Sequence, residues 1–114
     1  METEAVLDPE QARELIASNR ATAIDIRGDE EWRDKRVPGA RHASEQELES
    51  TLEQVDEEQI VLVVCDDGTR SAELAEKLRE SGREAACIDG GMEAWEKEKF
   101  PLQPSDDPAD DATV

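Results

Sequence analysis

The sequence is poor in aromatic and basic residues and has no long apolar stretch. Aromatic residues make up 3% of the 114 residues, tyrosine is missing, and lysine occurs four times. The longest apolar run, residues 60–65, is too short to cross a bilayer as a helix, so we expect no membrane-spanning segment. Residues 1–4 lack the basic and apolar regions of a secretion signal, which predicts a cytoplasmic location. The two cysteines are therefore expected as free thiols rather than as a disulfide.

Acidic residues dominate the charge. Aspartate and glutamate number 31 against 13 lysines and arginines, a formal net charge of −18. Such a chain repels nucleic acids and anionic membranes, so neither is expected as a partner. High net charge can indicate disorder, but the apolar run argues against that for most of the chain. The acid is spread along the whole sequence, which favours adaptation to high salt over a dedicated basic partner, because salt screens the self-repulsion.

Apolar segments that suit strands alternate with amphipathic segments that suit helices, which predicts an α/β domain with a parallel sheet. Residues 60–64 are apolar and mostly β-branched, as in a strand buried on both faces. A chain of this length forms one domain. Strands are predicted at about 4–7, 21–26, 41–43, 60–64 and 85–88, and helices at about 9–19, 30–36, 44–55, 70–81 and from 90 onward.

Two of the helix starts carry capping boxes. Asp8 and Gln11 form the first, with Pro9 in the first helical position, and Ser44 and Glu47 form the second. From residue 101 the composition changes to proline, aspartate, serine and alanine. We therefore expect a folded domain over residues 1–102 and an acidic, disordered tail over residues 103–114.

Cys65 stands where the central strand ends. Asp66, Asp67 and Gly68 turn the chain after it, and a helix follows. The carboxyl ends of parallel strands are where α/β sheets bind ligands, and the amides of such a loop stabilise an anion. The same field lowers the pKa of a thiol and makes it a nucleophile. The alternative for Cys65 is a small buried hydrophobic residue, which is the role that we expect for Cys87 inside its short strand.

Four motifs in sequence order resemble single-domain rhodanese-like sulfurtransferases. Taken singly each motif is weak, but four in register are strong, and the resemblance covers about residues 4–102. The motifs are Asp25-Ile26-Arg27, Glu31-Trp32 with Val37-Pro38-Gly39-Ala40, the Cys-x-x-Gly-x-Arg-Ser loop from Cys65 to Ser71, and Gly90-Gly91 with Trp95. The resemblance implies a rhodanese-like α/β fold with a mainly parallel sheet of about five strands, flanked by helices on both faces.

The resemblance also implies a mechanism. The Cys65 thiolate takes a sulfane sulfur from thiosulfate or a protein persulfide, and a thiol or another nucleophile then accepts it. The backbone amides of the loop are expected to bind the substrate sulfur; this loop consists of Asp66, Asp67, Gly68, Thr69, Arg70 and Ser71. Arg70 adds charge or fastens the loop to a carboxylate, while Asp25 and Arg27 support it or form a structural ion pair. No metal or organic cofactor is implied, and we expect a monomer.

Three alternative functions stay open, and the loop after Cys65 departs from the family pattern at Asp66 and Asp67. A cysteine phosphatase of the related type has five residues between cysteine and arginine, whereas this loop has four. Interaction modules on this fold commonly lack the cysteine, and a sulfur-relay protein has the same motifs as a thiosulfate enzyme. Asp66 and Asp67 depart from the basic or neutral residues frequent there, and they disfavour an anionic donor. His42, the only histidine, is expected to be structural.

Overall fold

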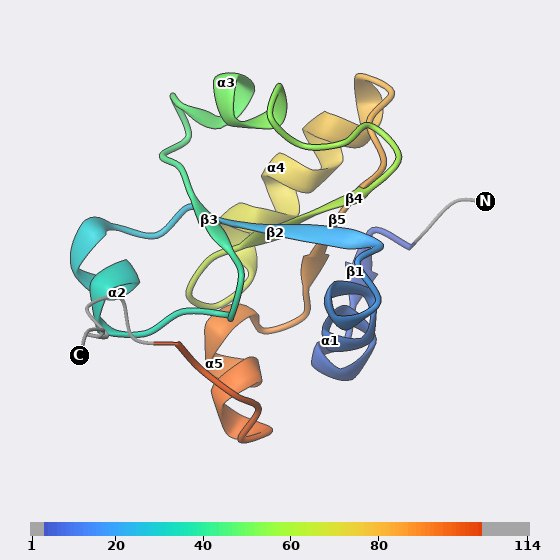
Figure 1. The fold of residues 1–114 in the computed structure, drawn as a ribbon. Helices are drawn as coiled ribbons and strands as arrows, with labels where there is room; N and C mark the ends of the chain where they lie inside the picture. Colours follow the sequence, from blue (N-terminus) through green and yellow to red (C-terminus); the bar gives the residue numbers. More distant parts are fainter. Residues whose placement is uncertain (1–3, 104–114) are drawn as a thin grey trace, which may run out of the picture.

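In the described part of the chain, a single sheet of five parallel strands is built around β4, at Ile60–Val64 (Figure 1). The computed structural model describes residues 4–103. The strand order is β1-β5-β4-β2-β3, and all neighbouring strands run parallel. The other strands are β1 at Val6–Leu7, β2 at Ala21–Asp25, β3 at Arg41–His42 and β5 at Ala85–Ile88. The predicted α/β class and parallel sheet are therefore confirmed.

β4 is central because its side chains are apolar on both faces. The side chains from Val61 to Val64 are fully buried, which a strand at a sheet edge could not achieve. Its register places Val64 beside Asp25 of β2 and Val63 beside Cys87 of β5. The ends of β2, β4 and β5 thus lie next to one another at the same edge of the sheet.

Helices cover both faces of the sheet (Figure 1). On one face, α1 and α5 pack on Leu62, Val64 and neighbouring apolar residues. On the other face, α3 and α4 pack on Val61, Val63 and their neighbours. The helices are α1 at Pro9–Ala17, α2 at Asp29–Asp34, α3 at Leu48–Leu52, α4 at Thr69–Glu80 and α5 at Gly91–Lys97. None of the helices within residues 4–103 is long and apolar enough to cross a membrane.

The ends of α1 and α4 follow from their sequences. At the start of α1, Asp8 accepts from the Gln11 amide at 2.8 Å, and the Gln11 side chain accepts from the Asp8 amide at 3.1 Å. At the end of α4, Gly82 takes a φ of 96°, and the amide of Arg83 donates back to Leu78 at 2.9 Å. This closing pattern is the one that favours glycine after a helix.

The predicted helix at about 44–55 is shorter in the structure. Ser44 and Glu47 do form the reciprocal hydrogen bonds of a capping box, at 3.0 and 3.2 Å. They close a tight turn, however, and α3 begins only at Leu48 and ends at Leu52. Val55 lies beyond the helix and is still buried in the core.

The C-terminal end of the described chain is paired. Gln103, the first residue of the predicted tail, exchanges backbone hydrogen bonds with Arg36 at 2.8 and 3.0 Å. The remainder of the predicted tail, residues 104–114, lies outside the described residues.

Candidate active site

Cys65 is the first residue after β4, and three polar groups surround its sulfur. The backbone amides of Gly68 and Ser71 donate to Sγ at 3.1 and 3.4 Å, and the hydroxyl of Ser71 lies 3.2 Å from Sγ. Ser71 is completely buried and Cys65 nearly so. The position at a strand end therefore supplies hydrogen-bond donors to a sulfur that is otherwise surrounded by apolar side chains.

The hydroxyl of Ser71 connects the thiol to the loop backbone. The Cys65 thiol donates to Oγ of Ser71. The Ser71 hydroxyl donates in turn to the carbonyl oxygen of Gly68, at 3.2 Å. A hydroxyl can rotate, so Ser71 can donate to the sulfur once the thiol has lost its proton.

Glycines allow the loop to curl around Cys65 and to sit against α5. Gly68 has a φ of 94°, and a Cβ there would lie 3.1 Å from the Gly90 amide nitrogen. A Cβ on Gly91 would overlap the carbonyl oxygen of Cys65 and lie 2.7 Å from the Gly68 amide nitrogen. This close approach explains why the Gly90-Gly91 motif accompanies the cysteine loop.

The first amides of α5 hold the other side of the loop. Met92 donates to the carbonyl of Cys65 at 2.9 Å, and Glu93 donates to the carbonyl of Asp66 at 3.0 Å. The carbonyl groups at the end of β4 are therefore satisfied by α5, which leaves the inward-facing amides of the loop for the sulfur.

Asp66 and Asp67, which follow Cys65, have exposed side chains. One oxygen of Asp67 accepts from the Thr69 amide at 3.0 Å and from the Thr69 hydroxyl at 2.6 Å. These hydrogen bonds lower the pKa of Asp67. The Thr69 amide is thus turned toward Asp67 and away from Sγ.

Arg70 is held by a carboxylate from another part of the chain. Its Nε and Nη2 donate to Oε2 of Glu45 at 3.0 and 2.6 Å. The hydrogen bond and the charge of Glu45 raise the pKa of Arg70, which also feels Cys65 and Asp66 electrostatically. Of the two roles predicted for Arg70, its contacts correspond to fastening the loop to a carboxylate.

Asp25 and Arg27 form a buried ion pair at the end of β2. Arg27 donates from Nη2 to Asp25 at 2.8 Å and to the carbonyl of Lys35 at 2.7 Å. Their side-chain hydrogen bonds fix the chain after α2, and none of them reaches residues 66–71 within the described structure. His42 donates from Nε2 to the Arg27 carbonyl at 2.8 Å and stacks on Trp32.

A cavity of about 740 Å³ opens beside the loop, between the ends of β2 and β3 and the turn before α3. Arg27, Asp29, His42, Glu45, Glu47 and Arg70 are among the residues that line it. Within residues 4–103, no group of three or more histidine, cysteine or acidic side chains is placed to hold a metal ion.

Residues 8–98 match the model of the rhodanese-like domain family. The chain belongs to this family. It is 32% identical to the thiosulfate sulfurtransferase GlpE of Actinobacillus pleuropneumoniae over 103 residues, which cover 90% of this chain and 95% of that protein. The resemblance drawn from the four motifs is confirmed at the level of the family.

Solved structures share the fold of this rhodanese-like domain. A rhodanese-like domain protein from Staphylococcus aureus superposes with a TM-score of 0.73 and 25% identity, covering 89% of this chain and 98% of that one. A protein of unknown function from Rhodopseudomonas palustris, described as a possible tyrosine phosphatase, has a TM-score of 0.72 and 26% identity and covers 90% of this chain and 85% of that one.

The rhodanese-like domain contains two contacts that the sequence did not predict. Glu45 lies 25 residues before Arg70 and is one of 31 acidic residues, so no local signal distinguishes it. The hydrogen bonds that Thr69 donates to Asp67 could have been found, because an aspartate side chain commonly accepts from the backbone amide two residues further on.

Proposed function

We propose that this rhodanese-like domain is a sulfurtransferase that carries a sulfane sulfur as a persulfide on Cys65. The observation that carries the proposal is the polar surroundings of one sulfur: two backbone amides donate to Sγ of Cys65, and the Ser71 hydroxyl, which accepts from the thiol, can rotate to donate to the thiolate. Donors that are already in place stabilise a negative sulfur without reorganisation. The 32% identity to a thiosulfate sulfurtransferase supports the same chemistry.

The proposed reaction has two halves. The thiolate of Cys65 attacks the outer sulfur of a donor, the sulfur–sulfur bond of the donor breaks, and the leaving group takes the electron pair. The terminal sulfur of the Cys65 persulfide is then attacked by a nucleophile, a thiol or cyanide, and the Cys65 thiolate is restored. Neither half needs a metal or an organic cofactor.

Each polar neighbour of Cys65 has a role in this scheme. Gly68 and Ser71 donate their amides to the sulfur throughout the cycle, and the Ser71 hydroxyl turns from the Gly68 carbonyl to the thiolate. The ion pair between Arg70 and Glu45 joins the start of α4 to the turn before α3. Asp25 and Arg27 act indirectly, because their ion pair fixes the end of β2 beside β4.

A cysteine phosphatase is the alternative that a structural neighbour raises. A phosphate needs several loop amides at once, and a loop with four residues between cysteine and arginine offers few. Here the Thr69 amide is occupied by Asp67. We therefore expect no useful hydrolysis of aryl phosphates, and phosphatase turnover as fast as sulfur transfer would overturn the assignment.

The donor and the acceptor are proposed as classes only. The donor is thiosulfate or a protein persulfide and the acceptor a thiol or another nucleophile, so a role as a relay between two proteins is the alternative within the same chemistry. We further propose a cytoplasmic monomer without nucleic-acid or membrane partners.

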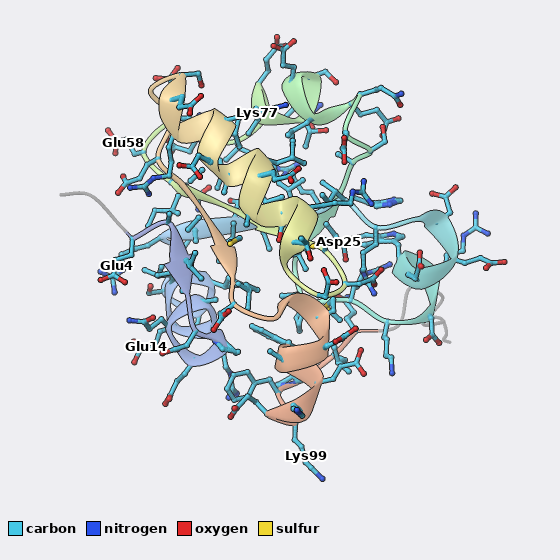
Figure 2. The ribbon with its side chains drawn as sticks, turned by 180° about the vertical axis from the view of Figure 1, so that it is seen from behind. Glu4, Glu14, Asp25, Glu58, Lys77 and Lys99 are labelled. Atoms are coloured by element: carbon cyan, nitrogen blue, oxygen red, sulfur yellow. The ribbon has the colours of Figure 1, made fainter. Side chains whose placement is uncertain are left out.

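The acidic surface supports a protein that works in high salt. Exposed carboxylates come from separate parts of the chain, including Glu4 before β1, Glu14 on α1 and Glu58 before β4 (Figure 2). Because salt screens their repulsion, the melting temperature should rise steeply from low to molar salt. A flat profile would contradict the proposal.

Intact mass spectrometry tests the sulfur carrier. After incubation with thiosulfate or with a persulfide donor, wild-type protein and Cys87→Ser should gain the mass of one sulfur atom, whereas Cys65→Ser should gain none. Subsequent cyanide should remove the added mass. Sulfur found on Cys87 while Cys65 is intact would rule out the assignment.

A further inference from the structure

The cavity beside the active loop is lined by two arginines, and both are already engaged by carboxylates. Arg27 is buried against Asp25, with 2.8 Å between Nη2 and Oδ2. Arg70 gives both Nε and Nη2 to a single oxygen of Glu45. Among the described residues that line this cavity, each arginine therefore has a carboxylate partner, and an incoming anion would have to compete for it.

The other charges at this entrance are negative. Asp29 and Glu47 line the same cavity, and the adjoining loop exposes Asp66 and Asp67. His42 directs its Nε2 to a backbone carbonyl. A donor that approaches Cys65 past Arg70 consequently meets an excess of negative charge.

We propose that Glu45 determines donor specificity: by occupying Arg70, it disfavours dianionic donors such as thiosulfate and leaves alkyl persulfides, which bring one negative charge on sulfur, as the preferred substrate class. This inference rests on the proposed sulfur transfer at Cys65. The side chains of Arg70 and Glu45 are 58% and 46% exposed, so their pairing adds little to stability. Its main consequence is the loss of a free cation near the nucleophile.

The two donor classes react by the same balanced step. The Cys65 thiolate attacks the terminal sulfur of R–S–S⁻, a new sulfur–sulfur bond forms, the old one breaks, and R–S⁻ leaves with the electron pair. With thiosulfate the leaving group is sulfite, and no oxidant or reductant is consumed in either case. The donors differ in charge, because thiosulfate brings two negative charges and an alkyl persulfide with a neutral R group brings one.

A charge-matched control is available two residues away. Glu47 lines the same cavity, and its side chain accepts from the Ser44 amide rather than from Arg70. Glu45→Gln and Glu47→Gln both remove one negative charge from the cavity and both keep an oxygen acceptor. Only Glu45→Gln removes the carboxylate that pairs with Arg70, and so only this variant leaves the positive charge of Arg70 without that negative partner.

The first measurement does not need sulfur transfer. Alkylation of Cys65, followed by peptide mass, is compared for iodoacetate, an anion, and iodoacetamide, its neutral analogue. In low salt with the fold intact, Glu45→Gln should raise the iodoacetate-to-iodoacetamide rate ratio about three- to tenfold, and Glu47→Gln less than about twofold. The difference should shrink in molar salt. An unchanged ratio in Glu45→Gln, or equal increases in both variants, would overturn the role of Glu45.

The second measurement uses thiosulfate and 2-hydroxyethyl persulfide as donors. Wild type should have the higher kcat/KM for the persulfide, and Glu45→Gln should lower KM for thiosulfate several-fold while the persulfide KM changes little. A wild type that prefers thiosulfate would overturn the inference. If the alkylation ratio shifts as expected but no donor loads sulfur, the electrostatic role of Glu45 is supported and the proposed sulfur transfer fails instead.

Discussion

The two cysteines have nearly the same burial and face the same core, yet their surroundings differ. Cys65 and Cys87 are 4% and 2% exposed and belong to the same apolar cluster on one face of the sheet. Cys87 lies inside β5, where its amide donates to the carbonyl of Ala5 at 2.9 Å. Cys65 lies one residue beyond its strand, where the chain curls and turns two amides toward the sulfur. Backbone position, rather than burial, is what separates the proposed nucleophile from a core residue here.

Displacing the loop from α5 should have the largest effect on this contrast. In Gly91→Ala, the new Cβ overlaps the Cys65 carbonyl at a residue with a φ of 59°, so we expect a loss of about 2 to 4 kcal/mol in the free energy of unfolding and near-complete loss of sulfur loading. Denaturant unfolding measures the free energy of unfolding, and intact mass spectrometry measures sulfur loading.

The matched control for this change is Gly82→Ala. Gly82 also has a positive φ, of 96°, but a Cβ added there would meet no atom within 4 Å. The substitution should cost about 1 to 2 kcal/mol and leave loading by the remaining folded protein unchanged. Equal losses of loading in the two variants would show that α5 does not shape the loop.

Removing the hydroxyl that contacts the sulfur of Cys65 should have an intermediate effect. Ser71→Ala deletes one hydrogen-bond partner of the thiolate, and a net hydrogen bond of about 1.4 kcal/mol corresponds to an approximately tenfold slower loading of Cys65. Intact mass spectra of samples quenched at successive times give the rate of loading. Ser81→Ala, at the far end of α4, should load at the wild-type rate; a normal rate in Ser71→Ala would remove the hydroxyl from the scheme.

The pH dependence of stability that Cys87 causes also tests the contrast between the two cysteines. Burial, and then the neighbouring charge of Cys65, raise the pKa of Cys87 above the ordinary value of 9.0. The folded state therefore keeps this proton at a pH where the unfolded chain has lost it, and stability falls as pH rises above about 9. Relative to Cys87→Ser, the melting temperature of wild type should decrease between pH 9 and higher pH. Parallel profiles would contradict this.

Neutralising the exposed acids of the loop should have the smallest effect. Replacing Asp66 and Asp67 by serine should raise thiosulfate loading about two- to threefold in dilute buffer and not at all in molar salt, where the Debye length is about 3 Å. The control replaces Glu57 and Glu58, which precede β4 at the opposite end of the strand. If the true donor is a basic protein, the loop substitutions should slow its docking instead.

The strands and the cysteine loop could be predicted because they depend on local pattern. The β-branched run from Ile60 fixes β4, and Gly68 fixes the turn after Cys65. The helix predicted after Ser44 is longer than the one in the structure. Its capping box closes a turn with backbone hydrogen bonds between residues three apart, such as the one from the Glu47 amide to the Ser44 carbonyl, and not the start of an α-helix. A capping box identifies a turn of this kind as readily as a helix.

The contacts that complete the site could not be predicted from the sequence. The partner of Arg70 is set by how the turn before α3 folds over the end of the sheet, and the choice of Glu45 among many acids follows only from that tertiary geometry. Similarly, Asp25 and Arg27 were expected to support the loop or to pair with each other. The residues beside them in the sequence give no sign of the Lys35 carbonyl that completes the pair.

The contact between Gly91 and the loop also limits how this protein could diverge. Adding one residue between Cys65 and Arg70 would push the loop outward, away from the two amides of α5 that hold the carbonyls of Cys65 and Asp66. A lineage that acquired such an insertion would first have to shift or shorten α5. We therefore expect loop length and the placement of the last helix to change together, because a change in either alone would leave backbone groups unpaired.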